Sequence, residues 1–128
     1  MPKKIKPIKA KAWKAFSLFI RKSHADKQGY VHCYTCDKKM HWKESQAGHC
    51  FSGRQNSILF EEQVVRPQCM GCNVFHHGQL HIFTHKLREE LGAELYEFLY
   101  KQQFQVVRYK YHDFLAIKVD YEFKCNLL

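Results

Sequence analysis

Acidic residues are scarce in this sequence, and their scarcity is uneven along the chain. The 128 residues hold 21 Lys and Arg against 12 Asp and Glu, which gives a formal net charge of +9. The first 25 residues contain eight Lys or Arg and no acid. Such a balance favours a polyanionic partner, with nucleic acid first and an acidic membrane surface second. For the N-terminal segment itself, both a solubilising tail and a phosphate-binding arm remain open.

Long apolar runs are missing as well. No stretch approaches the roughly 20 apolar residues that a membrane span needs, so we expect no membrane association by spanning. The apolar run from Ala12 to Ile20 is interrupted by Lys14 and is not followed by a small-residue cleavage site, which argues against a signal peptide. We therefore expect a soluble protein of the cytoplasm.

The remaining composition is that of a globular chain. Apolar residues make up 45% and aromatic residues 15%, and no internal repeat or low-complexity tract is present. The length fits one domain, residues 1–128, and we expect an α+β fold. We divide it into a basic lead-in (1–11), an amphipathic helix (12–28), a cysteine-rich finger (29–78) and a helical C-terminal part (79–128).

Apolar spacing predicts the elements within these parts. Helical spacing runs from Lys9 to about His24. A hairpin is expected over 30–42, two short strands over 46–50 and 64–66, and a helix from about 68 or 69 to Gly78. Two helices divided at Gly92 follow, and alternation over 104–111 suggests a strand. A last amphipathic helix carries a terminal stripe, which we expect to form part of a homodimer interface or else core: Phe114, Ile117, Tyr121 and Leu128.

Six cysteines are the most specific feature of the sequence. Two Cys-x-x-Cys pairs, Cys33 with Cys36 and Cys69 with Cys72, can each chelate one tetrahedral ion. In a reducing compartment such pairs favour metal ligation over disulfides, although a redox pair or chance buried thiols is the plainer alternative. Four thiolates leave no open coordination position, so the predicted zinc is structural. Cys50 and Cys125 lack partners at ligand spacing and are expected to be packed or surface thiols.

The separation between the two pairs is unusually long. Zinc ribbons commonly place about 15 to 20 residues between their pairs, whereas 32 residues intervene here and include His49. An insert held at both ends by one ion suggests that the insert carries the function.

Polar residues with a different chemistry follow the second pair directly. Asn73 comes after the last zinc thiolate, and His76 and His77 follow three and four residues later. On a continuing helix these side chains share a face, which brings an amide oxygen and an imidazole to one cation. His49, on a strand held by the same zinc, could face that cation and take a proton from an attacking water.

The order of these blocks resembles a known class of nucleases. Cys-x-x-Cys, then Gly-His, then Cys-x-x-Cys-Asn resembles the HNH or ββα-metal endonucleases, and the layout is similar to that of the endonuclease VII type. The segments "FSLFIRK", "GYVHCYTC", "WKESQAGH", "ILFEE", "VRPQCMGCN", "HHGQL" and "LREELGAELYEFL" resemble the NinG (Rap) family of phage recombination proteins. The resemblance covers nearly the whole chain after residue 12. It implies nicking of branched DNA such as Holliday junctions.

The resemblance also implies roles for individual residues. His49 matches the general base, Asn73 a ligand of a catalytic Mg²⁺ or Mn²⁺, and the four cysteines the zinc site. Arg54 falls where that family has a loop arginine, a phosphate contact. We add as DNA contacts four basic residues: Lys3, Lys4, Lys11 and Arg66.

Two departures from the family pattern affect the metal site. Many HNH enzymes carry an aspartate just before the base, and here that position is Gly48. The asparagine expected two residues before the Arg-Pro dipeptide is Val64, which would loosen the loop behind His49. The remaining ligands of the catalytic cation are therefore open, and the candidates are His77, His76 and Glu62.

Three functions are compatible with this pattern. The first is a metal-dependent DNA endonuclease acting on branched DNA, as a homodimer that places two symmetric nicks. The second is a zinc-stapled DNA-binding module without activity, and the third is an RNA-binding zinc protein of a ribosomal kind. The third does not explain the long insert. Gly48-His49 together with Asn73 favours the nuclease, because a pure binder has no reason to hold these residues beside its zinc.

Overall fold

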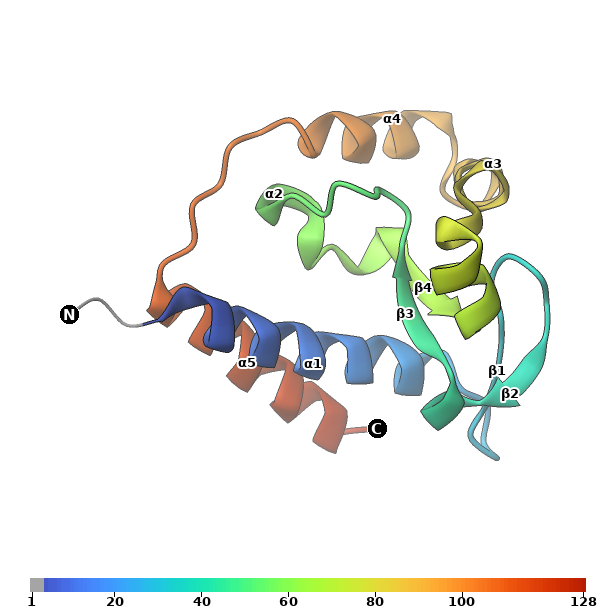
Figure 1. The fold of residues 1–128 in the computed structure, drawn as a ribbon, viewed down its shortest axis with the longest axis horizontal. Helices are drawn as coiled ribbons and strands as arrows, with labels where there is room; N and C mark the ends of the chain where they lie inside the picture. Colours follow the sequence, from blue (N-terminus) through green and yellow to red (C-terminus); the bar gives the residue numbers. More distant parts are fainter. Residues whose placement is uncertain (1–3) are drawn as a thin grey trace.

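The computed structural model describes residues 4–128, so Lys3 lies outside the described residues. Within them, helices combine with two small antiparallel sheets, of which β3–β4 lies among the helices and the β1–β2 hairpin at one edge, so the fold is α+β (Figure 1). In the same part of the chain, no helix is both long and apolar enough to cross a membrane.

Helix α1 (Ile5–Ser23) begins earlier than the sequence predicted, within what we expected to be a flexible basic lead-in. Ile8 and Ala12 are buried against Phe114, so the buried face of the helix already includes Ile8 of the lead-in. Pro7 lies in the first turn, where the missing N–H would have no helical partner in any case. The exposed lysines of the lead-in therefore project from a packed helix.

Helix α5 (Tyr111–Asn126) lies beside α1 and runs in the same direction (Figure 1). Phe114 packs near the start of α1, and Tyr121 meets Phe16 edge-on with ring centroids 4.9 Å apart. The predicted terminal stripe is therefore mainly intramolecular core, and our interface assignment for Phe114 and Tyr121 was wrong. Ile117 is partly buried in the same contact, and only Leu128 of the stripe is well exposed.

The two predicted pairs of strands are both present. β1 (Tyr30–His32) pairs with β2 (Lys39–His41) as a hairpin, with Val31 opposite Met40. β3 (Gln46–His49) pairs with β4 (Val65–Gln68), with His49 opposite Val65. All four residues of β4 are buried, so β3 is anchored along its whole length to the interior. Short turns and helices η1 (Trp42–Glu44), α2 (Asn56–Leu59) and η2 (Glu62–Val64) connect them.

The segment after β4 is not the regular helix that the sequence predicted. A π-helical turn, η3 (Gly71–Phe75), is followed by the short helix η4 (His77–Gln79), and the break falls at Gly78 with φ 87°. α3 (Leu80–Leu91) and α4 (Ala93–Gln102) then follow, divided at Gly92 as expected. Phe83 and Leu87 of α3 join Leu99 of α4 in the main core.

The predicted strand at 104–111 does not form. Residues 103–110 instead link α4 to α5 without regular structure, and Tyr111 already begins the helix (Figure 1). The alternating residues Phe104 and Val106 are exposed, so no sheet face covers them. A backbone carbonyl of this linker bonds to a side chain and not to a neighbouring strand, since the Asn56 amide donates to the carbonyl of Val107 at 3.1 Å.

Candidate functional site

The four predicted zinc cysteines converge on one point. Cys33 and Cys36 come from the β1–β2 hairpin, and Cys69 and Cys72 from the turn after β4. Their Sγ atoms all lie within 4.8 Å of one another, and the Cys36 and Cys69 sulfurs are 3.7 Å apart. Tetrahedral Zn–S bonds of about 2.3 Å place sulfurs about 3.8 Å apart. The cluster therefore has the donor type and spacing that suit zinc.

The thiols of this cluster do not ionise alike without a metal. Burial alone would raise the pKa of Cys33, but N–H groups of Cys69 and of the hairpin turn, with the Thr35 hydroxyl, lower it to about 6. Burial raises the pKa of Cys72 to about 12. Because metal ligation requires thiolates, a bound ion would have to displace the Cys72 proton. The affinity of the cluster for the ion should therefore fall as the pH falls.

The other two cysteines are packed thiols, one of the two options expected. Cys50 and Cys125 are buried, and neither forms a disulfide. Burial raises the pKa of Cys50 to about 12, so this thiol stays protonated and unreactive at neutral pH.

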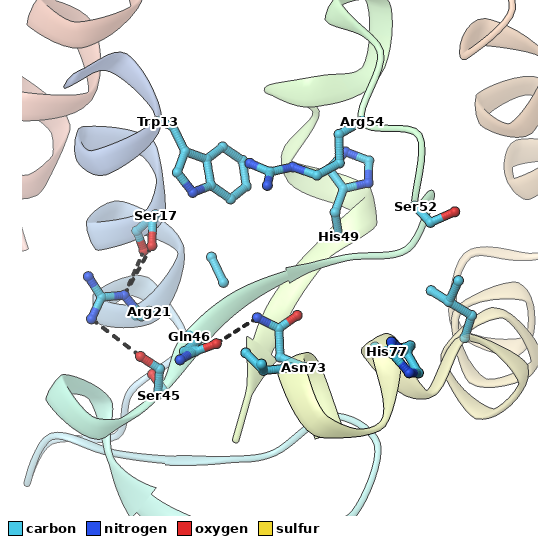
Figure 2. A pocket seen from close by; sticks show the side chains of 14 residues that line it. Trp13, Ser17, Arg21, Ser45, Gln46, His49, Ser52, Arg54, Asn73 and His77 are labelled. Atoms are coloured by element: carbon cyan, nitrogen blue, oxygen red, sulfur yellow. Dashed lines mark hydrogen bonds between the residues drawn. The ribbon is translucent and has the colours of Figure 1, made fainter. Parts of the chain in front are cut away.

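A cleft of about 610 Å³ opens beside the cysteine cluster, between α1, β3 and the turn after β4. It brings together four side chains singled out from the sequence, shown in Figure 2: His49, Arg54, Asn73 and His77. The sequence gave no reason to include Trp13, Arg21 and Gln46, which also line it. In the sequence, only the helical spacing along α1 and the alternation along β3 could have indicated that these three side chains face the cleft.

The lining of the cleft contains two arginines and two histidines but no aspartate or glutamate. Arg21 is held by Ser17 and by carbonyl oxygens of Trp42 and Ser45, so its charge is fixed at the cleft wall. An acid-free cationic cleft suits an anion such as phosphate.

His49 is buried, and both of its ring nitrogens bond to backbone. Nε2 lies 2.9 Å from the carbonyl oxygen of Ile58, and Nδ1 accepts from the N–H of Phe51 at 3.0 Å. The Ile58 carbonyl can only accept, so it fixes the proton on Nε2 and leaves the lone pair on Nδ1. Burial, together with the nearby Arg54 charge, lowers the pKa of His49 to about 4. His49 is therefore neutral throughout the physiological range.

Asn73 is oriented by a neighbour on β3. Its amide nitrogen donates to Gln46 Oε1 at 2.7 Å, and Figure 2 shows its oxygen directed away from Gln46. The N–H of Asn73 bonds to the carbonyl of Cys69, which ties its backbone to the cysteine cluster. Asn73 is thus fixed at both ends, as the sequence suggested for its backbone.

The structure separates the three candidates for further metal ligands. His77 lines the cleft with φ 52°, an uncommon conformation for a non-glycine residue. His76 does not line it. Glu62 lies elsewhere, where its carboxylate accepts from the Tyr121 hydroxyl at 2.7 Å.

Gly48 has a packing reason to be glycine. A Cβ at this position would lie 1.7 Å from Oε1 of Gln68, which is itself fully buried. The Gln68 amide donates to the Thr35 hydroxyl and to the carbonyl of Gly78. It therefore connects the hairpin turn to the point after η3 where the helix breaks. An aspartate before the base, common in HNH enzymes, would have no space here. Val64, the other departure, is buried, and its carbonyl accepts from the N–H of Cys50 at 2.9 Å, which anchors the chain next to His49.

The predicted DNA contacts differ in their access to solvent. The Arg54 guanidinium lies over the Trp13 ring, 4.2 Å from its centroid, at the mouth of the cleft. Lys4 and Lys11 are exposed on α1. Arg66 is 7% exposed, and its guanidinium bonds to Glu90 and to the carbonyls of Glu62 and Val65. In this structure Arg66 is an interior residue and is not available to DNA.

The cysteine cluster, the small sheets and the basic cleft together describe an α+β protein whose four clustered cysteines suit zinc. The family model described as Bacteriophage Lambda NinG protein matches residues 2–128. The chain therefore belongs to the NinG family of phage recombination-associated proteins. No curated protein and no solved structure matches the chain.

Proposed function

We propose that this protein is a metal-dependent DNA endonuclease of the HNH, or ββα-metal, type that nicks branched recombination intermediates such as Holliday junctions. The observation that supports this most is the cleft, which is lined by His49, Asn73, His77 and Arg54 and by no acidic residue. β3, β4 and the π-helical turn η3 come in this order along the chain, with α2 and η2 between the two strands and the cysteine cluster beside them. We assign this unit as a ββα-metal finger of the endonuclease VII layout.

His49 has the tautomer that a general base needs. With the proton held on Nε2 by the Ile58 carbonyl, Nδ1 carries the lone pair that would accept a proton from water. The Phe51 N–H now occupies that lone pair. Substrate entry must therefore replace this contact with the attacking water. A bound phosphate would also raise the His49 pKa, which strengthens the base where it is needed.

We assign Asn73 and His77 as the protein ligands of the catalytic cation, because both line the cleft. Mg²⁺ retains several waters and commonly takes one or two protein ligands together with substrate phosphate, so a carboxylate-free site remains compatible with Mg²⁺ or Mn²⁺. When bound, such a cation supplies charge stabilisation at the phosphate and its leaving oxygen. Gln46 keeps the Asn73 oxygen turned toward the cleft, because it engages the amide nitrogen.

Positive φ angles at residues that line the cleft also support a functional role for it. Among residues 4–128, four non-glycine residues have positive φ, and two of them, Arg54 and His77, line the cleft. Such conformations cost of order 1–3 kcal/mol each and gather at functional sites. Arg54 over Trp13 would contact a phosphate of the bound strand, since no acid neutralises it in the cleft.

We also propose that the active species is a homodimer, because resolving a four-way junction requires two symmetric nicks. The outer face of α5 is the surface we assign, since the inner face is core. Leu115, Val119 and Phe123 are exposed at four-residue spacing along it. An antiparallel pairing about Val119 would place Leu115 against Phe123 of a second copy. Val119→Lys should then yield monomers by light scattering, and a monomeric parent, free and on junction DNA, would contradict the assignment.

The proposal is tested by incubating a labelled four-way junction and a matched linear duplex with the protein, with magnesium and with magnesium omitted. A chelator is avoided here because it would also remove zinc. We expect magnesium-dependent nicks in the junction. If purified protein binds the junction but nicks neither DNA with magnesium or manganese, the zinc-stapled binding module is the correct function.

A further inference from the structure

A second cavity, of about 520 Å³, adjoins the cleft and shares Arg54 with it. It lies between the start of α1, the segment before α2 and the linker that joins α4 to α5. Lys9 and Arg54 are its charged residues, and its lining contains no acid. The cavity therefore continues the cationic surface of the cleft away from His49.

The walls of this cavity are fixed by side-chain contacts. Lys9 donates to Asn56 Oδ1 at 3.1 Å, and the Asn56 amide donates to the carbonyl of Val107 at 3.1 Å. These two bonds connect α1, α2 and the linker into one frame. A ligand would thus meet a preformed site.

The linker between α4 and α5 contributes a solvent-exposed aromatic ring to the cavity. Phe104 lines the cavity and is 67% exposed, which is a large apolar exposure for a residue next to packed helices. Tyr100 meets it edge-on, with ring centroids 5.5 Å apart and planes at 78°. The Tyr100 contact supports one edge of the Phe104 ring and leaves the ring available for stacking.

Side-chain amides supply the remaining polar groups. Gln55, Gln103 and Gln105 line the cavity, and their amides make no hydrogen bond to any other residue within 4–128. Each amide offers donors and an acceptor, so together they can meet the edge of any base without selecting one sequence.

We propose that this cavity binds one unpaired nucleotide of the DNA substrate, next to the phosphate held in the cleft. Its base stacks on Phe104, the glutamine amides meet its edge, and Lys9 with Arg54 contact its phosphates. The inference rests on the proposed function in that the ligand is DNA. It adds a reason for selecting branched DNA, because a branch point or bulge presents an unpaired base and a regular duplex does not.

The test compares three DNAs of one sequence, measured by fluorescence anisotropy without magnesium so that no cleavage occurs. They are a linear duplex, the same duplex with one bulged nucleotide, and the bulge with an abasic site. The parent protein is compared with Phe104→Ala, with Phe104→Trp, and with Phe98→Ala as control. Phe98 is 58% exposed on α4 and lies outside the cavity. Zinc content and thermal melting confirm that each variant is folded.

We expect Phe104→Ala to weaken binding of the bulged DNA by about 5- to 150-fold, the range for loss of one base–aromatic stack, with little change for the duplex. Phe104→Trp should restore the affinity. The parent should bind the abasic bulge more weakly than the intact bulge by a similar factor. Phe104→Ala should bind the abasic bulge with the same affinity as the parent does, because the stacking contact is already lost. The proposal is overturned if Phe104→Ala acts like Phe98→Ala, or weakens duplex and bulge equally. Failure of the parent to nick DNA would reject the nuclease function and leave this binding comparison unaffected.

Discussion

The cysteine cluster and the cleft share one short segment of chain, yet they are built in opposite ways. In the cluster, four sulfurs face one another and three of the cysteines are buried, so the site is closed by its own ligands. In the cleft, cations and amides face an open volume and no acid neutralises them. Cys72 and Asn73 are adjacent in sequence but belong one to each site. The cluster is closed around its own sulfurs, whereas the cleft remains open to solvent.

The largest effect should come from breaking the closed site. Cys69→Ser should abolish zinc binding and folding together, because structural zinc ligation is worth about 10–16 kcal/mol in small zinc peptides and a domain's whole stability is about 5–15 kcal/mol. Elemental analysis and circular dichroism measure the two losses. Cys50→Ala is the matched control, a buried cysteine outside the cluster, and should keep one zinc per chain. Well-folded parent protein without zinc would contradict this assignment.

In the open site, a substitution should remove activity and leave the fold intact. Asn73→Ala should slow junction nicking by about a hundredfold, the upper end of what loss of groups around a metal costs. Higher magnesium, or manganese, should restore part of the rate, since His77 and phosphate remain. Asn73→Asp keeps an oxygen at the same place and should nick far better than Asn73→Ala. Equal rates for both variants would mean that Asn73 is not a ligand.

The contact between the two sites can be tested at Gly48. Gly48→Ala drives a methyl group into Gln68, which joins the hairpin turn to the wall of the cleft. We expect a loss of about 1–3 kcal/mol in the free energy of unfolding, the range for overpacking. Gly53→Ala is the control, because a Cβ there meets nothing nearer than 3.7 Å. Urea denaturation measures both, and similar stabilities would show that Gln68 moves aside freely.

A smaller effect is expected from the surface lysines of α1. Replacing Lys4, Lys6 and Lys11 with Gln preserves the helix, whereas deleting residues 1–11 would remove part of it. Each lost phosphate contact should reduce the slope of log affinity against log salt by about 0.9. Binding of junction DNA across a salt series measures the slope. An unchanged slope would show that these lysines do not contact DNA phosphates and serve only to keep the protein in solution.

The smallest effect is expected from pH. His49 is neutral above its pKa of about 4, so lowering the pH from 7.5 to 5.5 should neither protonate it nor reduce kcat/KM through it. An ordinary histidine, with a pKa of about 6.5, would lose most of its basic form over that range. NMR of the imidazole carbons measures this directly. Titration of His49 near pH 6.5 in the free protein would show that the ring is not buried as described.

Sequence reasoning identified the cysteine cluster and the strands because spacing and alternation are local properties. It brought His49, Asn73 and His77 together from their positions along the chain, and Arg54 through family resemblance, and all four line one cleft. It missed Trp13, Arg21 and Gln46, since their approach depends on how α1 packs against β3. Arg66 was misjudged because nothing local indicates that a charged residue on β4 will be buried against Glu90.

The strand expected at 104–111 and the interface role expected for Phe114 and Tyr121 were wrong for a related reason. Alternation predicts a strand only where a neighbouring strand is available, and Asn56 satisfies the linker backbone instead. Helix α5 carries apolar residues on both faces, so periodicity could not tell which face would meet α1. Which face is core follows from tertiary contacts such as Phe16 with Tyr121.

The central claim is that His49 acts as a base in an open site, and single-turnover nicking of a four-way junction by His49→Gln tests it most directly. Glutamine keeps a donor and an acceptor for the Ile58 and Phe51 backbone groups, which alanine would leave unpaired at a cost of about 1–3 kcal/mol each. We predict intact zinc content and junction affinity with a rate about a hundred- to ten-thousandfold below the parent. A variant that nicks as fast as the parent at saturating magnesium would contradict the account.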